Sequence, residues 1–422
     1  MTATAKKPLL WQIMLLILGL YTLLEFYTIT DALVVIPHYL VLALCLGWFF
    51  IYPETPLIQP RNILPFLFLA GWTILNLASY IWAMDKTLVL SYAAWILRYM
   101  FLFFIYDKLF EDPELLRRFH WFLFLLVLLY VGTALLEMLT CKHLPVSRHY
   151  GSGFFVPSGP FYNENNLASY LLLFSPFLLF MPQIYGKRWL ALLSALVMPV
   201  IMVIMVIQGA RIAMLALGAF LAYFVIVQTT WKTKLVLLLA AVLLAGGIYV
   251  RYNREARLLY QVLDYQTSTL GSERKSIYMS SIQIRVQLIK ESIDMATRSG
   301  FIGVGGGNYE PNMQGDAIYR TAGITNAHNY FMELLGNWGL PGLLGFLCLY
   351  SYWLAGLWKL YRKSTGADRQ RYLMYLISLL LFVPSSSVPS SIRWDYFVWI
   401  YFAAVNSVLH TRPRQLAPEV GQ

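Results

Sequence analysis

Long apolar stretches separated by short polar segments run along almost the whole chain. Residues 189–207 and 235–250, for example, contain no charged side chain. About 20 apolar residues are enough to cross a bilayer, and such a stretch must be helical because hydrocarbon offers backbone amides and carbonyls no partner. The pattern therefore predicts an all-α integral membrane protein with about 12 transmembrane helices. We expect them at residues 9–25, 32–52, 63–83, 88–106, 119–140, 166–185, 189–208, 211–229, 233–250, 339–358, 372–384 and 394–410.

The loop between the ninth and tenth expected spans is too long for a simple connection, since structureless loops above about 15 residues are uncommon. Within it, apolar residues recur at helical spacing and predict an amphipathic helix over residues 281–298. They are Ile282, Val286, Ile289, Ile293 and Ala296. We therefore expect three parts: transmembrane helices 1–9 in residues 1–250, a large, partly helical external loop in 251–338, and helices 10–12 with a tail in 339–422.

Composition agrees with a membrane protein, and the basic residues set its orientation. Of the 422 residues, 59% are hydrophobic and 13% are charged, about half the charged share of a soluble domain. If the N-terminus is cytoplasmic, the inside segments hold 17 Lys and Arg residues, whereas the short outside loops hold only Lys86, Lys142, Arg148 and Arg393. This imbalance predicts that both termini are cytoplasmic and that the long loop lies outside.

The net charge of +11 is thus an orientation signal that also favours contact with anionic membrane lipids. It does not indicate a nucleic-acid partner, because the basic residues are scattered over many loops. The three cysteines, Cys45, Cys141 and Cys348, show neither a disulfide framework nor a metal-binding spacing. We expect no metal and no other cofactor.

Arg211 stands where two expected spans meet on the outer side. An arginine at the N-terminal end of a helix is unfavourable to the helix dipole unless an anion lies nearby. Together, a guanidinium and the positive end of a helix suit a phosphate or a carboxylate. The alternative is an interfacial arginine that contacts lipid headgroups.

The long loop adds two candidates. Arg285 lies three residues after Ile282 and four before Ile289 and so shares their face; it is either a functional inward-facing arginine or one at the edge of the stripe reaching to water. His328 is the side chain best suited to accept a proton near neutral pH, although a lone histidine is more often structural. The glycine run at residues 303–307 favours a turn over a phosphate-binding loop, because GxGGG alone is a weak phosphate signal. No Walker lysine follows it, so nucleotide hydrolysis is not indicated.

Taken in order, these segments resemble the O-antigen ligase and O-antigen polymerase superfamily of bacterial surface-glycan enzymes. The matching features are QGARIAML at 208–215, Arg285, FIGVGGGNY at 301–309, His328-Asn329, GLPG at 339–342 and, earlier, GPFYNENNLASY at 159–170. Two positions depart from the family's pattern. Ser299 stands where a proline is frequent, and Asn337 stands where an acidic residue is frequent, and both blur the choice of subfamily.

The resemblance implies a metal-independent, inverting glycosyltransferase on the periplasmic side of the bacterial inner membrane, with its catalytic segment in the long loop. The glycan moves from undecaprenyl pyrophosphate to a sugar hydroxyl of the lipid A-core oligosaccharide. Arg211 and Arg285 are then expected to stabilise the leaving pyrophosphate, and His328 to remove the proton of the attacking hydroxyl. The expected substrate-binding residues are Arg211, Arg285, Asn163, Asn166, Asn329 and Tyr330.

Four other functions stay open at this point. An O-antigen polymerase shares the donor and differs in the acceptor. A protein O-oligosaccharyltransferase often carries a longer external region. A lipid-linked glycan flippase or transporter needs a polar path through the membrane midplane, where Arg98 is the only obvious charge. A metal-dependent membrane glycosyltransferase that uses Glu25 and Asp31 predicts loss of activity with a chelator.

Overall fold

The computed structural model describes residue 47 and residues 58–228, 281–389, 391 and 396–410. The first, second and ninth expected spans lie largely or wholly outside these residues, as do Glu25 and Asp31. Every regular element in the described part is a helix. In chain order the elements are η1 Pro60–Asn62, α3 Ile63–Ala78, η2 Ser79–Ile81, α4 Lys86–Leu109, α5 Pro113–Thr140, α6 Glu164–Tyr185, α7 Arg188–Ile207, α8 Arg211–Tyr223, the π-helical turn η3 Phe224–Gln228, α10 Ser281–Arg298, α11 Tyr309–Asp316, α12 Tyr330–Lys363, α13 Gly366–Ser385 and α14 Tyr396–His410.

Within the described residues, seven helical segments are long and apolar enough to cross a membrane. They are Pro60–Ile81, Lys86–Leu109, Pro113–Thr140, Glu164–Tyr185, Arg188–Ile207, Arg211–Gln228 and Tyr330–Lys363. This agrees with a multi-pass, all-helical membrane protein, while the count of twelve spans stays a prediction. Residues 372–384, where the eleventh span is expected, lie within the longer helix α13, Gly366–Ser385.

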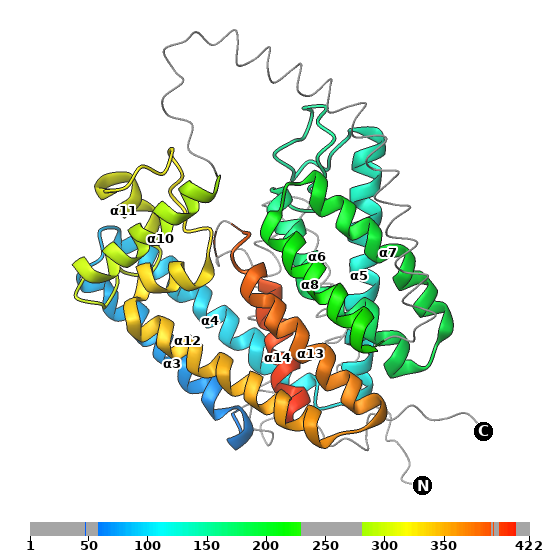
Figure 1. The fold of residues 1–422 in the computed structure, drawn as a ribbon. Helices are drawn as coiled ribbons and strands as arrows, with labels where there is room; N and C mark the ends of the chain where they lie inside the picture. Colours follow the sequence, from blue (N-terminus) through cyan, green and yellow to red (C-terminus); the bar gives the residue numbers. More distant parts are fainter. Residues whose placement is uncertain (1–46, 48–57, 229–280, 390, 392–395, 411–422) are drawn as a thin grey trace.

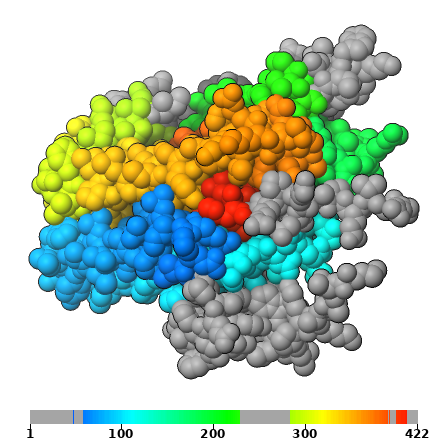
Figure 2. Space-filling model, turned by 90° about the horizontal axis from the view of Figure 1, so that it is seen from below, coloured from blue at the N-terminus to red at the C-terminus, as the bar shows by residue number. Residues whose placement is uncertain are grey.

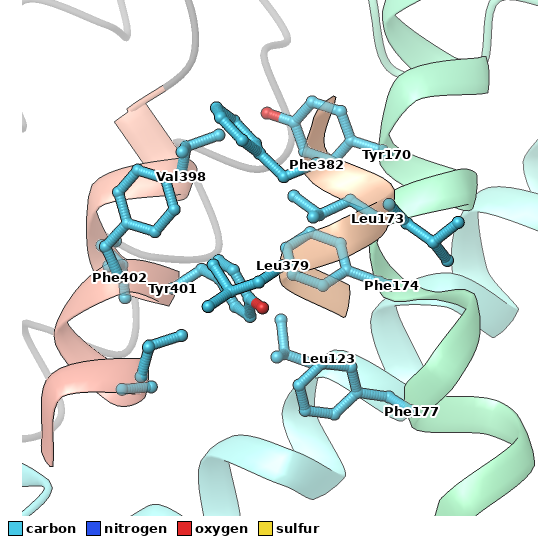
Figure 3. Close-up of a cluster of buried hydrophobic side chains, with 14 of the residues drawn as sticks. Leu123, Tyr170, Leu173, Phe174, Phe177, Leu379, Phe382, Val398, Tyr401 and Phe402 are labelled. Atoms are coloured by element: carbon cyan, nitrogen blue, oxygen red, sulfur yellow. The ribbon is translucent and has the colours of Figure 1, made fainter. Parts of the chain in front are cut away.

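The helix α13 lies at the centre of the bundle and packs against α6, α8 and α12 (Figure 1). Figure 3 shows Leu379 and Phe382 of α13 between side chains of α6 and α14. The rings of Phe382 and Phe402 meet edge to face with centroids 5.3 Å apart, and those of Phe174 and Tyr401 with centroids 5.8 Å apart. Lipid tails are as apolar as these side chains, so close packing rather than transfer out of water holds the helices together.

The helix α14 is enclosed by the rest of the bundle. Its residues 398–408 are all buried, and Figure 2 shows its surface between α3 and α13. Asn406 Nδ2 donates to Asp107 Oδ1 of α4 at 2.9 Å, and Arg61 forms an ion pair with Asp107 at 3.1 Å. A buried carboxylate is costly unless it is paired, so these contacts hold α14, α4 and η1 together at the end of the bundle opposite α10.

The helix α12 is broken where the tenth span was expected to begin. Gly339 has φ 65° and ψ −159°, and Pro341 has no backbone N–H to donate to the carbonyl of Asn337. The turn at residues 303–307 fills this break: Val304 N donates to Gly336 O and Gly305 N to Asn337 O, both at 2.9 Å. The glycine run is therefore a packing turn, as predicted, and two of its amides are already bonded to α12.

The helix α10 confirms the predicted range 281–298, but only part of its predicted apolar stripe is buried. Ala296 of that stripe is buried, whereas Val286, Ile289 and Ile293 are 45%, 37% and 48% exposed. The buried side is instead marked by Leu288 and Met295, both fully buried. These two belong to a second, small core with Tyr309, Met313 and Ala327. Both sides of α10 carry apolar residues, so the pattern alone could not identify the inner one.

Candidate functional site

Arg285 reaches from α10 toward the ends of two other helices. Its Nη1 donates to the carbonyl of Ser387 and, at 3.4 Å, to the carbonyl of His328. The side chain lies three residues before Leu288 on the buried side of α10, so it faces inward, although not along the stripe of Ile282 and Ile289. Burial lowers the pKa of its guanidinium from the ordinary value, but an arginine stays charged at neutral pH.

His328 occupies a constrained position just before α12. Its backbone is left-handed, with φ 48°, a region that non-glycine residues enter at a cost of about 1–2 kcal/mol. Burial, and secondly the charge of Arg285, lower the pKa of the imidazole to about 4, although backbone contacts with Val388 and Pro389 raise it. At pH 7 the ring is therefore neutral. Its Nδ1 is buried and has no hydrogen-bond partner among the described residues.

Asn329 and Tyr330 form the start of α12. Asn329 Oδ1 caps the helix by accepting from Met332 N at 3.1 Å, and its Nδ2 donates to Ser387 Oγ at 2.8 Å. Tyr330 is buried, and its N donates to Ser386 O at 3.1 Å. The hydroxyl of Tyr330 has no partner within the described ranges. Both predicted binding residues thus adjoin His328, and Asn329 also has a structural role.

The sequence reasoning did not foresee the segment that joins these residues. Residues 385–389, here called the serine loop, begin at the last residue of α13 and contact Arg285, His328, Asn329 and Tyr330. The loop is fixed to α6 by a hydrogen bond of 2.6 Å between Ser385 Oγ and Ser169 Oγ. The signal that could have identified it is the polar run SSSVPSS at residues 385–391 between two apolar stretches.

Arg211 is the first residue of α8 and is exposed. The turn before it is closed by Gly209, with φ 66°, and Gln208 Nε2 donates to Pro157 O at 2.8 Å. In the described part of the chain no direct contact joins Arg211 to Arg285 or His328. The helix α13, which ends in the serine loop, packs against both α8 and α12 and so lies between the two arginine-bearing regions.

Asn163 and Asn166, at the start of α6, differ in how their side chains are used. Asn163 caps α6 by accepting from Asn165 N at 2.6 Å. The Oδ1 of Asn166 is buried and has no hydrogen-bond partner among described groups. Asn166 precedes Ser169 by one turn, and Ser169 bonds to the serine loop. The N-terminal end of α6 is thus connected to the region of Arg285 and His328.

Comparison with known proteins supports the motif reading. The sequence model of the O-antigen ligase family matches residues 200–347. The chain is also 26% identical over 375 residues to the teichuronic acid biosynthesis protein TuaE of Bacillus subtilis (strain 168), covering 85% of this chain and 74% of that protein. The resemblance predicted from the motifs is therefore confirmed: this chain is similar to the O-antigen ligases over the stretch that carries Arg211, Arg285 and His328.

Proposed function

We propose that this membrane protein is a glycosyltransferase of cell-envelope polysaccharide synthesis that uses a lipid-linked glycan. The donor is a glycan on undecaprenyl pyrophosphate, and the acceptor is a sugar hydroxyl of the lipid A-core oligosaccharide on the periplasmic side of the inner membrane. The observation that carries the proposal is the placement of Arg285 against His328, two residues far apart in sequence. A fixed positive charge beside a neutral imidazole suits the departure of an anionic group and the removal of a proton.

Each residue then has a defined task. As the bond between the anomeric carbon and the pyrophosphate breaks, negative charge grows on the leaving group, and the guanidinium of Arg285 stabilises it. Arg211, exposed at the start of α8, contributes a second charge from the other side of α13 once the donor is bound. The acceptor hydroxyl attacks the opposite face of the sugar, so the anomeric configuration is inverted. The hydroxyl gives its proton to His328.

The donor itself improves His328 as a base. In the free protein Arg285 helps to hold the pKa of His328 at about 4, which makes the imidazole a weak proton acceptor. A bound pyrophosphate brings opposite charge that favours the imidazolium, so the pKa rises toward neutrality, where a general base is most effective. His328 therefore accepts a proton more readily when donor is bound.

Polymerase activity is the second candidate, and one observation favours it. The relative TuaE is described as a teichuronic acid biosynthesis protein, which points to polysaccharide assembly in general rather than to a lipid A-core acceptor. A polymerase uses the same donor chemistry and places a second lipid-linked glycan in the acceptor position. The two functions therefore differ only at the acceptor.

The test is a reconstituted transfer assay that offers both acceptors. Purified protein is mixed with a glycan on undecaprenyl pyrophosphate and with rough lipopolysaccharide, in EDTA and without nucleotide. A ladder of enlarged lipopolysaccharide supports the ligase, whereas elongation of the lipid-linked glycan alone supports the polymerase. If neither forms in EDTA and added magnesium or manganese restores transfer, the metal-independent mechanism is wrong and the alternative with Glu25 and Asp31 gains support.

A further inference from the structure

Ser387 contacts Arg285 and the neighbour of His328 through two different groups. Its carbonyl accepts from Arg285 Nη1, and its hydroxyl oxygen accepts from Asn329 Nδ2 at 2.8 Å. No motif of the sequence pointed to this residue. It lies more than 50 residues from Asn329 and about 100 from Arg285 along the chain, so only the fold brings the three together.

The bond to Asn329 bears directly on His328. Asn329 uses its Oδ1 to cap α12 and its Nδ2 to reach Ser387, so both ends of its amide are held. His328 precedes it with φ 48°. A strained backbone of this kind persists only where the surrounding contacts enforce it. The Asn329–Ser387 hydrogen bond is one such contact, and it fixes the chain on the C-terminal side of His328.

The serine loop is itself anchored at the two residues that come just before Ser387. Ser385 Oγ bonds to Ser169 Oγ of α6 at 2.6 Å, and Ser386 O accepts from Tyr330 N at 3.1 Å. Ser387 therefore presents its two acceptor oxygens from a loop that is tied to α6 and α12. A residue held in this way keeps its hydrogen-bond partners in fixed positions.

We propose that Ser387 is a positioning residue for glycan transfer: its hydroxyl orients Asn329 and hence His328, while its carbonyl orients Arg285. One residue, Ser387, thus sets the positions of both His328, which takes the proton, and Arg285, which stabilises the leaving group. The inference rests on the proposed function and deepens it. Ser387 itself neither gives nor takes a proton in the reaction.

The test compares Ser387→Ala with Ser387→Thr and with the matched control Ser386→Ala. Ser386 Oγ donates to Val383 O at 2.7 Å, within its own helical turn, so its removal leaves the site contacts in place. Ser387→Ala should lower kcat roughly tenfold, the upper range for one neutral hydrogen bond, while the donor KM changes less than about twofold because the carbonyl to Arg285 remains. Ser387→Thr should keep most of the activity, and Ser386→Ala should match wild type.

The single variant Asn329→Ser removes the same hydrogen bond from the other side and should slow transfer to a similar degree, so it keeps the proposal testable if Ser387→Ala accumulates poorly. Where both variants accumulate, a double-mutant cycle tests the bond itself. Asn329→Ser retains a good helix cap but is too short to reach Ser387. The double variant Asn329→Ser/Ser387→Ala should then be no slower than Asn329→Ser alone, because both changes remove the same bond.

Two kinds of failure can be told apart in these assays. If wild type transfers glycan and Ser387→Ala does so at the same rate, the positioning role is overturned while the proposed function stands. Equal losses of rate and of melting temperature in Ser387→Ala and Ser386→Ala also overturn it, since they indicate a structural defect alone. If wild type transfers no glycan to either acceptor, the proposed function fails and the positioning role fails with it.

Discussion

The pH dependence of transfer is a direct test of the role proposed for His328. Burial and Arg285 lower the pKa of this imidazole from 6.5 to about 4. A base must be deprotonated, so activity is present above the pKa and is lost as the pH falls through it. At pH 5.5, about 97% of His328 is neutral with a pKa near 4, against about 9% for an ordinary histidine. The free enzyme should thus keep almost all of its active form at a pH where a normal histidine retains about a tenth.

The measurement is kcat/KM for the donor between pH 4 and pH 8, because this parameter reports the ionisation of the free enzyme. The acid limb should lie near pH 4 to 5. The limb of kcat should lie at higher pH, since the bound pyrophosphate raises the pKa of His328. His328→Ala should lack the limb and be slower by roughly 10²- to 10⁴-fold, the usual contribution of a general base.

Arg285→Gln supplies the matched perturbation. Glutamine removes the positive charge and leaves a shorter, neutral side chain with an amide donor, so the pKa of His328 should rise and the acid limb of kcat/KM should move to higher pH. Burial remains, and because it is the larger cause, the limb should stay below pH 6.5. A wild-type limb already at pH 6.5, or an Arg285→Gln limb that does not move, would refute this reasoning. Membrane insertion of each variant is checked first by its accumulation in purified membranes.

Three further predictions concern binding, packing and orientation. Arg211→Ala and Arg285→Ala each remove a charge-assisted contact worth about 1.5–3 kcal/mol, so the transfer rate should fall more than donor affinity. Arg→Lys should restore little activity, because an ammonium cannot form the guanidinium fork. Equal losses in donor affinity and in rate would contradict stabilisation of the leaving group. Gly306→Ala places a Cβ against Asn76 Oδ1 and should lower the free energy of unfolding by about 1–3 kcal/mol. The control Gly218→Ala, with open space around its Cβ, should leave the melting temperature unchanged or slightly higher. A wild-type melting temperature for Gly306→Ala would count against the tight turn. Reporters that are active only in the cytoplasm should be active when fused after Arg188 and Lys363, and inactive when fused near Arg274. Activity at Arg274 would place the long loop on the cytoplasmic side and contradict the predicted orientation.

The sequence alone determined the helical framework of the described region. A transmembrane helix satisfies its backbone hydrogen bonds within its own segment, so an apolar run predicts it without knowledge of its neighbours. The ranges expected at 166–185 and 189–208 agree closely with α6 Glu164–Tyr185 and α7 Arg188–Ile207. The amphipathic helix at 281–298 was predicted for the same reason, since its periodicity is local.

The order of the motifs also identified the family resemblance, and with it Arg211, Arg285 and His328 as candidates. Their roles remain predictions. Sequence could not tell that Arg285 and His328 lie together while Arg211 lies across α13, because a motif states which residues are present and not how far apart the fold places them.

Only the tertiary structure decided the inner face of α10, the filling of the break in α12 and the part played by Ser387. Apolar residues occur on two sides of α10, and the choice of Leu288 and Met295 over Val286 and Ile289 depends on what packs against the helix. The break at Gly339 is stable because distant amides at residues 304 and 305 satisfy its carbonyls. Ser387 meets Arg285 and Asn329 across separations that carry no periodic signal, since such contacts are set by how whole helices pack against one another.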